Sequence, residues 1–145
     1  MPFLDPAGKK EGKFLKFWFP VFLYSGIIFY ASSLPNLKPP FEIVNLDKVV
    51  HILGYLLFGL LLTRAFCRQW PWMDGAGEAW SWAKTWQVVA LCSLIYGLSD
   101  EYHQSFVPGR ESDVIDLVAD TIGGFLGAYV YSIWIDRVRN KQKVH

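Results

Sequence analysis

The residues of this chain that could do chemistry are concentrated between Asp100 and Asp120, in the stretch DEYHQSFVPGRESDVIDLVAD. It holds six carboxylates, one arginine, one histidine and one glutamine. Carboxylates beside histidine suit a bound divalent cation, general acid–base catalysis, or a self-satisfied network that holds helices in register. Apolar segments flank the stretch, and ionisable groups are costly beside hydrocarbon, so the cluster requires a structural or a functional explanation.

The acids after position 112 share one face of a predicted helix. On an ideal helix, Asp113, Asp116 and Asp120 fall at about 0°, 300° and 340°. Gly124 and Gly127 continue this stripe, and small residues let a neighbouring helix approach, so the stripe faces protein. Asp113 and Asp116 are also explained as helix-starting residues, with Asp113 as the N-cap. Asp120 lies about 10 Å further along the helix, in the apolar layer, where a carboxylate needs a partner.

Arg110 is one candidate partner of Asp120. It follows a Pro-Gly turn that directs it back over the helices, and a guanidinium binds a carboxylate or phosphate through two hydrogen bonds. Two other helix faces supply further polar groups at helical spacing. They are Asp47, His51 and Tyr55 on one face, and Asp100, His103 and Gln104 on the other.

These groups predict a polar pocket. Its expected ligand-binding residues are Asp47, His51, Asp100, Gln104, Arg110, Asp116 and Asp120. The metal candidates, for a divalent cation such as Mg²⁺ or Ca²⁺, are Asp100, Asp113, Asp116 and Asp120. The catalytic candidates are His51, His103 and Glu101. The sequence contains no GxSxG, HExxH or CxxC motif, so no particular reaction is indicated.

The composition favours a membrane protein. Half of the chain is hydrophobic, at 52%, and 17% is aromatic, with a mean hydropathy of +0.22. No basic stripe interleaved with aromatics is present, which argues against nucleic-acid binding. Cys67 and Cys92 have the spacing of neither a metal knuckle nor a disulfide, and we interpret both as small buried apolar residues.

Four apolar segments are long enough to span a membrane as helices. They cover residues 17–34, 47–66, 86–104 and 113–135. The basic leader before the first also fits a secretory signal peptide, but its bulky aromatics and the later spans favour an uncleaved anchor. Five tryptophans between positions 70 and 86 are typical of an aromatic belt at headgroup depth. The predicted fold is an all-α integral membrane four-helix bundle forming one domain over residues 1–145, with a basic tail that is interfacial or disordered.

The positive charges predict the orientation. Eleven Lys and Arg residues belong to the leader, the second loop and the tail, against three on the opposite side. Basic residues stay on the cytoplasmic side, so both chain ends are expected there. The first and third loops, which carry the polar motifs, then lie together on the extracytoplasmic face. We therefore expect a multi-pass protein of the bacterial cytoplasmic membrane that contacts lipids.

Two motifs resemble the VanZ-like family of small bacterial membrane proteins. The first is DKxxHxxxY from Asp47 to Tyr55, and the second is DExxQxxxPGRxxDxxDxxxDTxxG from Asp100 to Gly124. The resemblance covers roughly residues 15–135. It implies a four-helix envelope protein, and the family takes its name from a member associated with resistance to the lipoglycopeptide teicoplanin. It implies no catalytic residues.

Three functions remain open from the sequence. The first is binding of an anionic lipid-linked or glycopeptide-type ligand at the outer leaflet, through Arg110 and a cation held by the acids. The second is a non-catalytic accessory or structural subunit of a larger membrane complex, whose carboxylates hold helices together. The third is an enzyme that modifies a lipid headgroup, with His51 or His103 as its base.

Overall fold

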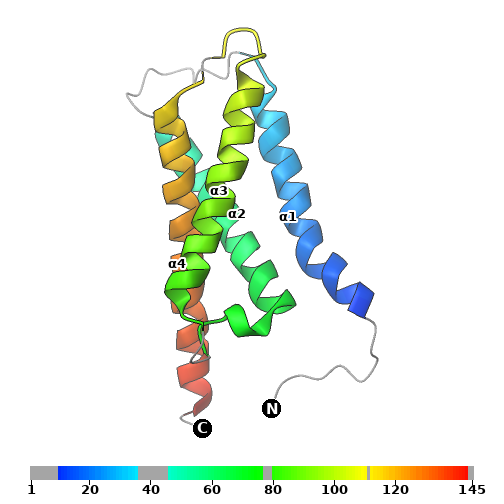
Figure 1. Cartoon of the computed structure of the whole chain (residues 1–145), viewed down its shortest axis with the longest axis vertical. Coiled ribbons are helices and arrows are strands. Elements are labelled where there is room, and N and C mark those ends of the chain that lie inside the picture. The colour runs from blue at the N-terminus through cyan, green and yellow to red at the C-terminus, as the bar shows by residue number, and fades with distance from the viewer. Residues whose placement is uncertain (1–9, 36–45, 77–79, 111, 144–145) are drawn as a thin grey trace.

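The computed structural model describes residues 10–35, 46–76, 80–110 and 112–143, with side chains from Phe14 in the first range and from Lys48 in the second. The helices are α1 (Lys10–Ser32), α2 (Leu46–Gln69), α3 (Trp82–Gln104) and α4 (Val114–Lys143), with a short 3-10 helix η1 (Pro71–Met73). No sheet is present in these ranges, so the all-α prediction is confirmed. The four long helices lie side by side, with the C-terminal ends of α1 and α3 beside the N-terminal ends of α2 and α4 (Figure 1).

Three of the four helices are long and apolar enough to cross a membrane. These segments are Phe14–Ser32 of α1, Lys48–Gln69 of α2 and Val114–Lys143 of α4. Helix α3 is not among the spans found in the described residues, and its last turns carry Asp100, Glu101, His103 and Gln104. The prediction of four spans is therefore confirmed for three.

The helices differ in length from the prediction. Helix α1 begins at Lys10, inside the expected leader, and α3 begins at Trp82 rather than at residue 86. Helix α4 continues to Lys143, so most of the expected tail is helical. No proline or glycine follows Gly127, and nothing in the local sequence stops the helix before its charged end.

Helices α2 and α4 approach closely enough for backbone contact. A Cβ added to Gly127 would lie 2.2 Å from the carbonyl oxygen of Leu56, and one added to Gly59 would lie 2.2 Å from that of Gly124. Gly123 is similarly tight against Ile52. The glycine stripe of α4 therefore faces protein, as predicted, and brings the acids on the same face of α4 against α2.

Helix α1 is joined to its neighbours through fewer contacts. Val21 is buried in the core with Tyr55, Phe58 and Val89. Two tyrosines hydrogen-bond across helices: Tyr24 donates to the carbonyl oxygen of Gly54 at 3.1 Å, and Tyr96 donates to that of Ser25 at 2.6 Å. These partly buried hydroxyls are satisfied by carbonyl oxygens of a neighbouring helix, which helps to fix how α1 lies against α2 and α3.

The opposite end of the helices is closed by the tryptophan-rich segment. Arg139 of α4 pairs with the Asp74 carboxylate and donates to the Asp74 carbonyl oxygen at 3.0 Å, and the Trp82 indole donates to Asp136 at 3.2 Å.

Both cysteines are free: Cys67 is buried and Cys92 is half-buried. The prediction that both are buried is confirmed for Cys67 and is wrong for Cys92.

Candidate functional site

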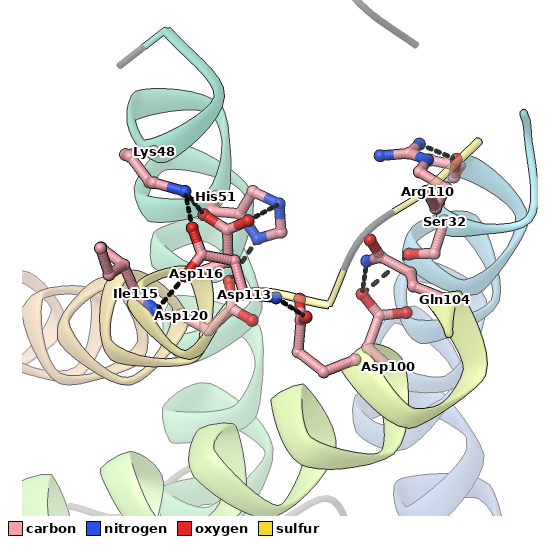
Figure 2. A network of polar contacts seen from close by, with 12 residues as sticks. Ser32, Lys48, His51, Asp100, Gln104, Arg110, Asp113, Ile115, Asp116 and Asp120 are labelled. Atoms are coloured by element: carbon pink, nitrogen blue, oxygen red, sulfur yellow. Dashed lines mark hydrogen bonds and ion pairs between the residues drawn. The ribbon is translucent and has the colours of Figure 1, made fainter. Parts of the chain in front are cut away.

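A polar end cluster forms where the N-terminal turns of α2 and α4 meet the C-terminal turn of α3. We define it by six residues: Lys48, His51, Glu101, Asp113, Asp116 and Asp120. Figure 2 shows Lys48 and His51 of α2 reaching toward Asp113, which precedes α4, and toward Asp116 and Asp120 of α4. The prediction that two separated polar motifs meet at one end of the helices is thus met by the geometry.

Lys48 bridges two carboxylates at the start of α4. Its Nζ lies 2.6 Å from both Asp113 Oδ2 and Asp116 Oδ1. Asp113 Oδ1 also accepts a hydrogen bond from the Ile115 backbone N–H at 2.8 Å, which is the N-cap role expected from the sequence. Hydrogen bonding from Lys48 holds the pKa of Asp113 below its usual value. Lys48 was absent from the predicted site residues, although it precedes His51 by three positions and so shares its helix face.

His51 is the partner that the depth of Asp120 requires. Its Nδ1 lies 2.8 Å from Asp120 Oδ1, and the Asp120 side chain is completely buried. An ionised carboxylate only accepts, so Nδ1 carries the proton of this hydrogen bond. The other ring nitrogen, Nε2, lies 3.9 Å from Asp116 Oδ2. A histidine oriented by a buried aspartate is an arrangement that suits both acid–base chemistry and metal binding.

Glu101 joins α3 to the same cluster. Its Oε2 accepts a hydrogen bond from the Asp113 backbone N–H at 2.8 Å. Its other oxygen, Oε1, is buried and makes no hydrogen bond of normal geometry with the described residues, and the same holds for Asp120 Oδ2 and the Tyr55 hydroxyl. The Tyr55 hydroxyl lies close to Asp120, and the Ser112 hydroxyl lies close to Glu101. Asp120 Oδ2 faces α3, since a Cβ added to Gly97 would lie 2.9 Å from it.

The remaining predicted residues of α3 contact α1 instead. Asp100 Oδ2 accepts hydrogen bonds from Ser32 at 2.8 Å and from Gln104 at 3.0 Å. His103 Nε2 lies 2.9 Å from the Ser33 hydroxyl, and its ring stacks on Phe29. Figure 2 shows Ser32, Asp100 and Gln104 apart from Lys48, His51 and Asp116. The single predicted pocket is therefore two groups of contacts, one between α2, α3 and α4 and one between α1 and α3.

Of the candidate partners, His51 contacts Asp120 and Arg110 does not in the described structure. The Arg110 Nε donates to the Leu34 carbonyl oxygen at 3.1 Å, and its Nη2 donates to that of Ala31 at 3.0 Å (Figure 2). The last carbonyls of a helix lack partners within the helix and form the negative end of its dipole, so they attract a guanidinium. The remaining predicted residue, Asp47, lies in α2, but its side chain is outside the described residues.

Removal of the Arg110 guanidinium is expected to loosen the end of α1. In Arg110→Ala, exchange of the Ser33 and Leu34 amides, which bond back to Phe29 and Ala31, should speed up roughly fivefold to tenfold, the equivalent of about 1 kcal/mol. Hydrogen exchange of the purified protein in micelles measures this. Arg139→Ala, at the other end, should leave both amides unchanged, and equal acceleration in the two variants would refute the capping role.

The fold and the cluster together define the class: a small helical protein with membrane-compatible helices and ionisable groups buried at one end. The VanZ/LLP1 family model matches residues 10–135, nearly the whole chain, and the chain therefore belongs to the VanZ/LLP1 family. The resemblance seen in the motifs is confirmed. Neither a curated protein nor a solved structure matches the chain.

Proposed function

We propose that this protein is a multi-pass protein of the bacterial cytoplasmic membrane that binds the polar headgroup of a lipid-linked or glycopeptide-type molecule at the outer leaflet. In this proposal both chain ends are cytoplasmic, the four helices form a bundle in the membrane, and the polar end cluster lies at the extracytoplasmic surface. The charge bias of the loops supports the orientation, and membership of the VanZ/LLP1 family supports an envelope protein.

The observation that carries the proposal is the set of unpaired acceptors in the cluster. Asp120 is fully buried and Glu101 is 5% exposed, yet each has one carboxylate oxygen that makes no hydrogen bond of normal geometry with the described residues, although the Tyr55 and Ser112 hydroxyls lie close by. Buried polar atoms are nearly always paired, and groups that serve only to hold helices together gain nothing from an unpaired oxygen. A ligand that approaches from the membrane surface can supply the missing partner.

The ligand must meet an acceptor-rich, acidic site. Arg110, the anion-binding group that the sequence suggested, donates to carbonyl oxygens at the end of α1, and Lys48 is shared by Asp113 and Asp116. The ligand therefore presents a positive group toward Asp120 and Glu101. This group is an amine of the headgroup itself or a metal ion that in turn holds a phosphate.

Retention of bound lipid tests this proposal. Wild-type protein extracted in mild detergent should carry a lipid or lipid-linked adduct in native mass spectrometry, and His51→Gln should carry at least about tenfold less, the equivalent of one lost charge-assisted hydrogen bond. Asp136→Asn on the same helix α4, at the opposite end, is the matched control. Equal adducts in all three proteins, with unchanged helical content, would exclude headgroup binding by the cluster.

An accessory, structural role is the second candidate, and one observation favours it. Each paired group of the cluster joins two helices: Lys48 and His51 join α2 to α4, and Glu101 joins α3 to α4. In this case Asp116→Asn would change stability in detergent while leaving any bound lipid in place. The enzyme alternative depends on the His51 and Asp120 pair and would show as a change of lipid class on overexpression.

A further inference from the structure

The unpaired oxygens of Asp120 and Glu101 lie beside an imidazole. One ligand atom each from His51, Glu101 and Asp120 can be chosen so that all three lie within 4.8 Å of one another. The three residues come from three different helices, α2, α3 and α4, and converge at one point of the fold. Ligand atoms at about 2.0–2.2 Å from an ion lie at most about 4.4 Å apart, so closure around an ion requires movements of only a few tenths of an ångström.

Among the described residues, little positive charge lies beside the two buried carboxylates of this site. Lys48 is the near ammonium group, and it contacts Asp113 and Asp116 on the exposed side. In the described part of the chain, His51 contacts the Asp120 carboxylate, and the Glu101 carboxylate lies beside both. Two carboxylates in a buried site require either a shared proton or a cation of higher charge.

We propose that His51, Glu101 and Asp120 bind one divalent transition-metal ion, Zn²⁺ or Mn²⁺. One imidazole with two carboxylates suits these ions, whereas Mg²⁺ and Ca²⁺ are bound by oxygen ligands. The site therefore differs from the all-aspartate set that the sequence suggested, since it omits Asp100 and Asp113 and requires a histidine.

The rest of the cluster fits the surroundings of such a centre. Glu101 Oε2 is fixed by the Asp113 N–H, which leaves Oε1 for the ion. His51 and Asp116 are partly exposed, at 17% and 12% of their side chains, so the open side of the site faces the helix ends. Three protein ligands leave a coordination position for an outside group, as in catalytic rather than structural zinc sites.

This inference rests on the proposed function in one respect only, which is the role of the ion in binding a headgroup. A bound ion supplies the positive charge through which an anionic headgroup, such as a phosphate, can be held at an acidic site. Binding of the ion itself depends on the three side chains and not on any lipid. The two proposals can therefore fail separately.

Direct metal binding tests the inference. The full chain, purified in detergent and stripped with a chelator, is titrated with MnCl₂ or ZnCl₂, and bound metal is measured by elemental analysis after desalting and by the electron paramagnetic resonance of Mn²⁺. We expect one ion per chain and a higher unfolding temperature. Glu101→Gln and Asp120→Asn should weaken binding at least about tenfold. Asp100→Asn is the matched control, because this buried carboxylate is one residue from Glu101 but contacts Ser32 and Gln104.

Two results would overturn the metal site. One is the absence of saturable Mn²⁺ and Zn²⁺ binding to folded wild-type protein. The other is equal loss of binding in Asp100→Asn, which would remove the named ligand set. If Asp120→Asn does not fold, Glu101→Gln decides the question, since it keeps the His51 and Asp120 pair.

The metal and lipid results separate the two proposals. Metal binding without any retained lipid would contradict the proposed function and leave the metal site intact. Lipid retained equally by metal-free protein would contradict the ion's role in headgroup binding.

Discussion

Gly127→Val is expected to abolish the packing of α2 against α4 and to leave little folded protein in the membrane. The added Cβ would lie 2.2 Å from the Leu56 carbonyl oxygen and 2.7 Å from the Leu60 backbone nitrogen. Both obstacles are backbone atoms, which cannot rotate away, so the helices must separate. Overpacking in a core costs about 1–3 kcal/mol even where side chains can adjust, and here we expect at least the upper end of that range.

Gly26→Val is the control for this prediction. Gly26 lies within helix α1, and a Cβ placed there meets nothing within 4 Å. Valine has a higher helix propensity than glycine, so this variant should be neutral or slightly stabilised. Thermal unfolding in micelles, followed by circular dichroism, measures both proteins. A Gly127→Val protein that unfolds at the same temperature as Gly26→Val would show that α2 and α4 are not held by backbone contact.

Much of this fold is predictable from the sequence because long apolar runs leave few alternatives. The runs that begin near positions 17, 47, 86 and 113 correspond to α1, α2, α3 and α4. The helix ends are less predictable: polarity does not end a helix, so α4 continues to Lys143 through residues that sequence reasoning assigned to a tail. The weak spanning character of α3 reflects the polar residues at its end, which face neighbouring helices.

The sequence predicts which residues of the site need a partner, but it does not predict which residue supplies that partner. The depth of Asp120 along α4 showed that its carboxylate needs a partner, and this holds in the structure. Arg110 and His51 were both candidates for that partner. The choice depends on the position that the segment between α3 and α4 gives to Arg110, whose guanidinium donates to the Ala31 and Leu34 carbonyl oxygens at the end of α1. Sequence spacing within one helix contains no information about that competition.

His51→Ala is expected to lower the free energy of unfolding by about 3–5 kcal/mol. The substitution leaves the fully buried Asp120 carboxylate without its 2.8 Å partner, and an unpaired buried charge costs more than the lost hydrogen bond alone. Urea or thermal unfolding in micelles gives the change in the free energy of unfolding. His103→Ala is the control: this half-buried histidine contacts the Ser33 hydroxyl instead of a carboxylate, so its loss should cost about 1 kcal/mol.

The double variant shows whether the cost comes from the pair or from the histidine alone. If His51 acts mainly by compensating Asp120, then Asp120→Asn in the His51→Ala background removes the uncompensated charge and restores part of the stability. The coupling free energy between the two positions should then reach about 1–3 kcal/mol. Additive effects would mean that Asp120 already has another compensating group, such as a proton or the ion proposed above. Repeating the cycle with chelator and with added Mn²⁺ separates these two, because only coupling through the ion changes with the metal.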